Sequence, residues 1–289
     1  MFFDLFGNYL VDNNKMTSDQ LASLKEAQAS SRLKLGFIAV SEKMITEKQS
    51  EEINRKQAVM DKRFGDIAVE LGYLTDEQVG QLLGLQGNTY LKFCQLVTEQ
   101  GIMSMEDIEA QLKAYVASCG FEEAAIEDIK SDDIDRIIPL FTPDIEDKYS
   151  EILAVGIRTI NRLVSSNICI SKGCVVDSLD ISDYAIQALV GDFNVKTGFV
   201  GQGDSLLVIA DAYAREHFDA VDEDALDSVA EFINIINGLY ATSISYQKVN
   251  VELMPPELIT GNKKIEAAKI AVMPITIDGC DVKMFLAIS

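Results

Sequence analysis

The first 120 residues repeat one order of apolar and polar positions four times. Segments of 24 residues that begin at Leu5, Lys34, Arg63 and Lys92 align at a spacing of 29 residues, with five residues between one segment and the next. The second aligned position is apolar in every copy, and the third is glycine in three copies and Cys94 in the fourth. A fixed period of this length is typical of helical repeat proteins. The pattern therefore predicts an all-α domain of four repeats over residues 1–120.

Polar positions inside each copy predict where its helices end and begin. The thirteenth position is serine or threonine, which suits a helix N-cap, and a glutamine three residues later completes a capping box in the first three copies. The tenth position precedes it and suits a left-handed helix C-cap, although Lys43 is an exception among Asn14, Gly72 and Gly101. Each copy is thus predicted to be a short helix, a turn and a longer helix. Such hairpins bury their apolar faces only by packing on one another.

The segment 121–146 is acidic and contains Pro139 and Pro143. Its apolar residues from Ile134 to Phe141 have helical spacing. We interpret it as a connector, with a helix that closes the first domain followed by a short linker.

Residues 147–289 mix long helical patterns with strand patterns. Helices are expected over 147–165 and 222–244, with a short helix carrying His217 between them. Strands are expected over 168–176, 193–200, 205–210, 248–253, 264–273 and 282–288, with turn signals at 201–204 and at Asp278-Gly279. This order predicts an α+β domain in which long helices cover one antiparallel sheet.

Charge and cysteine usage narrow the function classes. The net charge is −21 and no segment is basic, which argues against a nucleic-acid partner and against an anionic membrane surface. The five cysteines form no C-x-x-C pair, so neither zinc spacing nor a disulfide framework is present, as in a reducing cytoplasm. No run of 18 apolar residues occurs and the N-terminus lacks a basic region, so we expect a cytoplasmic protein without membrane insertion.

The helix expected over 222–244 carries two stripes. Its apolar stripe is Leu226, Val229, Ile233, Ile236 and Tyr240, and a second stripe on another face is Asp227, Glu231, Asn234 and Gly238. A glycine inside a helix costs about 1 kcal/mol relative to alanine. Gly238 therefore suggests that something approaches the backbone there, whereas the simpler interpretation of the polar stripe is a solvated helix face.

This half of the chain resembles the CheC/CheX/FliY family of chemotaxis phosphatases, the CheX branch most closely. The resemblance rests on Asp227, Glu231, Asn234 and Gly238, followed 21 residues after Asn234 by Pro256. Some relatives carry a second copy of the site on the earlier helix. Here that helix has Ala154 where the amide is required, which implies a single site.

The resemblance implies removal of phosphate from the phospho-aspartate of a CheY-like response-regulator receiver. Asn234 would orient the attacking water and Glu231 would pair with a receiver lysine, while Asp227 and Gly238 would contact the partner. The receiver would supply Mg²⁺, so no cofactor of the chain's own is expected. CheX relatives can pair through their sheets, which leaves a homodimer open.

The repeats resemble the N-terminal domain of type II secretion and type IV pilus ATPases. In one branch, the MshE-like proteins, tandem units of this kind bind cyclic di-GMP. The matching candidates here are Lys34, Gly36, Arg63, Gly65, Gly72 and Gln86. The alternative function is that of a non-catalytic interaction protein that docks a receiver or a motility or secretion component, with or without a cyclic di-GMP response.

Overall fold

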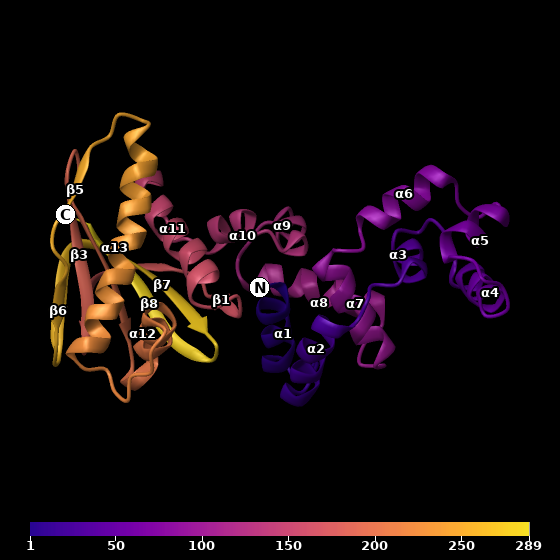
Figure 1. Cartoon of the computed structure of the whole chain (residues 1–289), viewed down its shortest axis with the longest axis horizontal. Helices are drawn as coiled ribbons and strands as arrows, with labels where there is room; N and C mark the ends of the chain where they lie inside the picture. Colours follow the sequence, from indigo (N-terminus) through magenta and orange to yellow (C-terminus); the bar gives the residue numbers. More distant parts are fainter. Residues whose placement is uncertain (289) are drawn as a thin grey trace. The chain divides into compact units, whose positions relative to one another are not determined.

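The computed structural model describes residues 1–288 and divides them into two compact units, which we describe separately (Figure 1). The first unit is Phe2–Asp132 and the second begins at Asp133. The segment 121–146 gives one helix to each unit, α9 (Ala125–Ser131) to the first and α10 (Ile134–Phe141) to the second. The helix expected to close the first domain therefore belongs to the second unit, where Ile137, Ile138 and Phe141 are buried.

The first unit is built of helix pairs at the registers that the sequence pattern predicts. The pairs are α1 (Phe2–Asp12) with α2 (Ser18–Ser30), α3 (Leu35–Ser41) with α4 (Glu47–Gln57), α5 (Phe64–Glu70) with α6 (Asp76–Gly84), and α7 (Thr89–Glu99) with α8 (Met105–Ser118). That these pairs descend from one repeat stays a prediction from the sequence.

Local capping explains why each pair turns where it does. Thr17, Thr46 and Thr75 form reciprocal capping boxes with the glutamine three residues later, and Ser104 forms one with Asp107. The residues at the tenth position, Asn14, Lys43, Gly72 and Gly101, all have φ between 56° and 69°. Lys43 therefore adopts the same left-handed conformation as the glycines, although its side chain disfavours it.

The third-position glycines let the two helices of a pair approach closely. A Cβ atom on Gly7 would lie 2.4 Å from Leu21, and one on Gly65 would lie 2.8 Å from Val79. On Gly36 it would lie 2.7 Å from the Ser50 hydroxyl. These glycines are thus required by packing within the first unit.

Aromatic side chains join the first and fourth helix pairs. Phe93 of α7 packs edge-on against Phe2 and Phe3 of α1, and Tyr115 of α8 contacts Phe6. All five side chains are buried. The first unit thus has a core of its own, to which residues far apart in the sequence contribute.

The second unit is one antiparallel sheet with helices packed on it. The strands are β1 (Ile168–Ile170), β2 (Cys174–Ile181), β3 (Tyr184–Gly191), β4 (Val195–Gly201), β5 (Val251–Leu253), β6 (Glu257–Ile259), β7 (Lys263–Ile277) and β8 (Cys280–Ile288). Their order is β1-β7-β8-β4-β3-β5, with β2 also paired to β7 and β6 to β3. The helices are α11 (Asp147–Leu163), α12 (Leu207–Ala214) and α13 (Glu223–Ser245), and α13 packs on β3 and β4. The expected α+β architecture is confirmed.

Several expected elements are wrong in detail. Residues 205–210 form the 3₁₀ turn Gly203–Leu206 and the start of α12, not a strand, so 201–204 is not a hairpin turn. The single strand expected over 168–176 is split into β1 and β2, and β3 and β6 were not expected at all. The hairpin at Asp278-Gly279 is confirmed, since Ile277 pairs with Cys280 and both turn residues have positive φ.

In residues 1–288 no helix is both long enough and apolar enough to cross a membrane.

Candidate functional site

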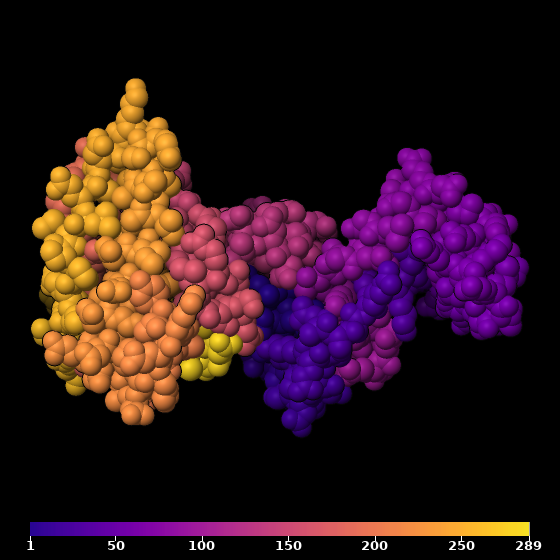
Figure 2. Space-filling model, viewed as in Figure 1, coloured from indigo at the N-terminus to yellow at the C-terminus, as the bar shows by residue number. Residues whose placement is uncertain are grey.

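The polar stripe of α13 lies on the surface of the second unit. Asp222 caps the helix by accepting a hydrogen bond from the Ala225 N–H, and the helix then runs 23 residues to Ser245. All five members of the apolar stripe are fully buried against the sheet and the neighbouring helices. Asp227, Glu231 and Asn234 are exposed and Gly238 is half-buried, and atoms of this stretch (orange) form part of the surface in Figure 2. The structure therefore brings all four predicted residues onto one accessible face.

A side chain of strand β3 holds Asn234 from the sheet side of α13. The Gln187 Nε2 group of β3 donates to Asn234 Oδ1 at 2.8 Å and to the Met254 carbonyl oxygen at 2.9 Å. The Gln187 Oε1 atom accepts from Asn237 Nδ2 at 2.8 Å. Neither Gln187 nor Asn237 was a candidate from the sequence. The available signal was a glutamine inside the otherwise apolar run around it in β3 and an asparagine on the buried side of α13.

Gly238 has no packing reason to be glycine. A Cβ atom built on it would meet no atom of the described chain within 4 Å, and its φ is not positive. The glycine therefore leaves open space one turn beyond Asn234 without serving the fold of the second unit.

Glu231 lies beside Tyr213 of α12. Burial and the neighbouring Glu231 carboxylate raise the pKa of the Tyr213 hydroxyl above its usual value. The Tyr213 ring packs edge-on against Phe232, which is fully buried. Glu231 therefore projects from a well-packed part of the helix, with the Tyr213 hydroxyl as a neighbour.

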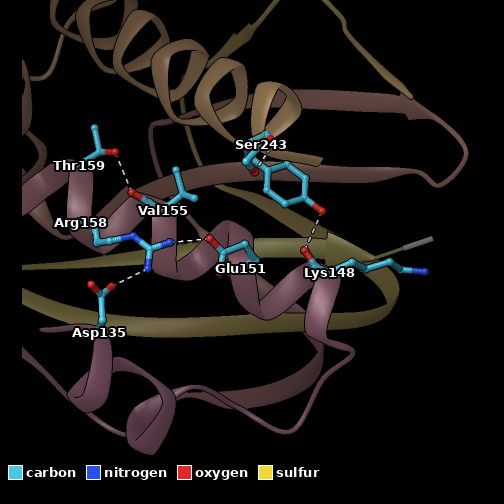
Figure 3. Close-up of polar contacts among 8 residues, drawn as sticks. Asp135, Lys148, Glu151, Val155, Arg158, Thr159 and Ser243 are labelled. Atoms are coloured by element: carbon cyan, nitrogen blue, oxygen red, sulfur yellow. Dashed lines mark hydrogen bonds and ion pairs between the residues drawn. The ribbon is translucent and has the colours of Figure 1, made fainter. Parts of the chain in front are cut away.

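The earlier helix α11 uses the corresponding acid differently. Glu151 accepts from Arg158 Nη2 at 2.5 Å, and Arg158 Nη1 donates to Asp135 of α10 at 2.7 Å (Figure 3). Ala154, at the position of the amide, is nine-tenths buried. The guanidinium thus ties α11 to α10 and occupies the carboxylate that a second site would need.

The β5–β6 turn, which contains Met254 and Pro255, connects the site to the edge of the sheet. Met254 donates from its backbone N–H to the Ala188 carbonyl at 2.9 Å, so the pairing of β5 with β3 continues up to Pro255.

His217 does not lie on a helix as expected. It follows the end of α12, where its ring contacts Asp211 at 3.0 Å, and this hydrogen bond raises the pKa of His217.

Most of the nucleotide candidates of the first unit line one pocket. The pocket has a volume of about 840 Å³ and is lined by residues of α3 to α6 and their connections. Among them are Arg32 and the candidates Lys34, Gly36, Arg63, Gly65 and Gln86. Gly72 does not line it and instead occupies the left-handed turn after α5.

Two of the candidate side chains that line this pocket already have partners. Lys34 Nζ forms an ion pair with Glu99 at 2.8 Å, and Gln86 Nε2 donates weakly to the Leu33 carbonyl at 3.4 Å. Two arginines, Arg32 and Arg63, remain as planar cationic groups at the pocket.

Comparison with known proteins gives a family match in the second unit. Residues 184–277, which include β3, α13 and the Pro255-Pro256 turn, match the family model described as "Chemotaxis phosphatase CheX". No curated protein matches the chain.

Several solved structures of chemotaxis proteins are similar to about half of this chain. The chemotaxis protein CheX from Vibrio vulnificus is 13% identical, with a TM-score of 0.43 over 50% of this chain and 100% of that one. The CheX-CheY-BeF3-Mg+2 complex from Borrelia burgdorferi gives 19% identity and a TM-score of 0.42 over 49% and 97% of the two chains. FliY from Thermotoga maritima gives 16% and 0.34 over 48% and 84%. By the family-model match, residues 184–277 of this chain are similar to chemotaxis phosphatases of the CheX family.

Proposed function

We propose that the second unit removes the phosphoryl group from a phospho-aspartate of a response-regulator receiver domain. The observation that carries the proposal is the exposed face of α13, where Glu231, Asn234 and Gly238 lie in line within the range that matches the CheX family model. The reaction is hydrolysis of an acyl phosphate. Water attacks phosphorus, the bond from phosphorus to the aspartyl oxygen breaks, and the products are a free carboxylate and inorganic phosphate.

Asn234 is the group that would act on the water. Its amide does not ionise, so it can orient a water in line with the breaking bond over a wide pH range. Its Oδ1 atom accepts from Gln187, which leaves Nδ2 and the second lone pair of Oδ1 for the water. The receiver would hold the Mg²⁺ that neutralises the phosphoryl charge, and this chain would add positioning.

Glu231 and Gly238 would set the register of the docked receiver. An exposed carboxylate one turn before Asn234 is placed to pair with a lysine of the receiver, and such a pair is worth most when the interface excludes water. Gly238, which has open space around it, would let the receiver approach the helix backbone. Asp227 lies one turn further out and would contribute to the acidic field that attracts a basic partner edge.

The test is the lifetime of the phosphoryl group on a panel of receiver domains from the same organism. Each receiver would be phosphorylated by a small phosphodonor, freed of the donor and followed with and without this protein. Faster phosphate loss from one receiver supports the proposal and identifies the partner. Binding of a receiver without faster loss would contradict turnover and leave α13 as a docking surface, which is the non-catalytic alternative.

A second candidate function concerns the pocket of the first unit. We propose cyclic di-GMP as its ligand, because Arg32 and Arg63 line it together and an arginine plane can stack on guanine. Gly36 and Gly65 also line the pocket, and there they serve the close packing of the helices.

Calorimetric titration of cyclic di-GMP into the protein tests this second proposal. Binding that is lost in Arg63→Ala but kept in Arg55→Ala, a surface arginine that does not line the pocket, would support it. Absence of heat at ligand concentrations well above the micromolar range would contradict it.

A further inference from the structure

Two buried amides lie directly beneath Asn234. Gln187 is 2% exposed and Asn237 is fully buried, yet both sit between the helix and the sheet where apolar residues surround them. Burying an amide costs free energy unless its donors and acceptors are paired. The pair is not ideal in this respect, because Asn237 Oδ1 has no hydrogen-bond partner among the described residues. A role in stability alone therefore explains these side chains poorly.

Hydrogen bonds fix the orientation of the Gln187 amide first and, through it, that of the Asn234 amide. The Met254 carbonyl can only accept, so the Gln187 atom that faces it must be the nitrogen Nε2. The same nitrogen faces Asn234, so the Asn234 atom that it contacts must be the oxygen Oδ1. The Asn234 Nδ2 group then points away from the sheet, and a main-chain carbonyl of the β5–β6 turn determines which way the exposed amide faces.

Asn237 completes this arrangement from the helix. Its Nδ2 group donates to Gln187 Oε1, which places a donor against the only atom of the Gln187 amide that can accept. Rotation of the Gln187 amide by 180° would oppose two oxygens at Met254 and two nitrogens at Asn237. Both neighbours therefore hold Gln187 in the same orientation.

We infer that Gln187 is a positioning residue for the reaction proposed above, since it prevents the Asn234 amide from rotating and so keeps Nδ2 towards the docked partner. This inference rests on the proposed function of Asn234. Without Gln187, an exposed amide on a helix surface samples both orientations and several rotamers, and only one of these presents the water correctly.

A double replacement separates positioning from stability. In Gln187→Leu, Asn237 Nδ2 loses its partner, and the second unit should unfold at a lower temperature. Adding Asn237→Leu replaces both buried amides by apolar side chains, which should recover most of the lost stability. The double variant still leaves Asn234 unheld, so a structural role and a positioning role predict opposite results for it.

The control is Thr159→Val. Thr159 is equally buried in α11 and, within residues 1–288, its hydroxyl donates to the Val155 carbonyl of its own helix (Figure 3). The Thr159→Val replacement therefore removes one buried hydrogen bond in the same unit and leaves the amides of Gln187 and Asn237 unchanged.

Two readouts are required. The first is the side-chain NH₂ signal of Asn234 in ¹⁵N NMR, assigned by its loss in Asn234→Ala and followed for its shift and its exchange with water. The second is kcat and KM on the receiver that the phosphoryl-lifetime panel identifies.

In the double variant we expect the Asn234 NH₂ signal to shift and exchange faster, and kcat to fall about tenfold with KM within about twofold of the unaltered protein. Thr159→Val should keep both kcat and the NMR signal. An unchanged Asn234 signal, or an unchanged kcat with a freed amide, would overturn the inference.

If no receiver responds to the unaltered protein, the proposed function fails, and with it the catalytic part of the inference. The NMR readout then still decides whether Gln187 fixes the Asn234 amide, because that measurement needs no partner.

Discussion

Lys43 occupies a left-handed backbone position that its three counterparts fill with asparagine or glycine. Its φ of 57° matches Asn14 and the two glycines, so the turn geometry is imposed on lysine by the capping of α3 and α4 on either side. For a residue with a Cβ atom, this conformation costs about 1 kcal/mol or more of conformational free energy.

Lys43→Gly should therefore stabilise the first unit by about 0.5–1 kcal/mol, since the relief of strain exceeds the added flexibility of the unfolded chain. Chemical denaturation followed by circular dichroism measures the change. The reverse replacement at the equivalent position, Gly72→Lys, should destabilise by a similar amount. If both variants shift stability in the same direction, the conformational argument is wrong.

Gly238 presents the opposite case, a helix glycine that the fold does not require. Gly238→Ala should raise the stability of the second unit by about 1 kcal/mol, because alanine has the higher helix propensity and no described atom is near enough to clash. The same variant should slow dephosphorylation of the receiver if the space is reserved for the partner. The measurement is a pair of denaturation and phosphoryl-lifetime curves.

Gly80 of α6 provides the matched control, since it also lies inside a helix with open space around it. Gly80→Ala should stabilise its own unit without any effect on the receiver. Full phosphatase activity in Gly238→Ala would mean that the glycine has no role in docking.

At the scale of the elements, α11 and α13 are two long helices of one unit that differ in what their exposed acids do. Glu151 is bound by Arg158, whereas Glu231 lies beside the Tyr213 hydroxyl and forms no ion pair within residues 1–288. Arg158 is also paired with Asp135, so α11 serves to anchor α10.

Restoring the missing amide on α11 should therefore not create a second site. We expect Ala154→Asn to be inactive in the background of Asn234→Ala, because residue 154 is nine-tenths buried and the adjacent carboxylate is occupied. Phosphoryl lifetimes on the receiver measure this. Recovered phosphate loss in the double variant would show that the sequence pattern suffices without the surroundings described for α13.

The sequence predicted those helices whose ends are marked by capping residues or whose apolar residues form a clear stripe. Capping residues placed the helices of the first unit, and the apolar stripe placed α13 within one residue of its ends. The run Ser205–Ala210 was mistaken for a strand because a short apolar run has the same appearance in a strand and in a buried helix. Strand β3 was missed because most of its residues are buried on both faces and show no alternation.

The candidate site was predictable only as far as it lies on one helix. Helical spacing placed Asp227, Glu231, Asn234 and Gly238 on one face, and they are on it. Gln187 could not be paired with Asn234 from the sequence, since the contact joins residues 47 positions apart in two elements and depends on the strand register.

At the scale of the whole molecule, the chain holds two units with separate cores. The first has the aromatic cluster around Phe93, and the second has the sheet with α11, α12 and α13.

We therefore expect fragments 2–132 and 133–289 each to unfold cooperatively when expressed alone, and 133–289 to keep the phosphatase activity. Thermal unfolding of each fragment and the receiver assay measure this. A second fragment that folds but is inactive would show that the first unit takes part in the reaction.

The central claim is that Asn234 orients the water that attacks the phospho-aspartate. The most direct measurement is the phosphoryl lifetime on the responding receiver with the unaltered protein and with Asn234→Ala. The fold should survive this change, because Gln187 Nε2 keeps the Met254 carbonyl as an acceptor and residue 234 is exposed. We predict that the variant still binds the receiver and that the acceleration of phosphate loss falls about 100-fold or more. Unchanged acceleration by a folded Asn234→Ala variant would contradict the account.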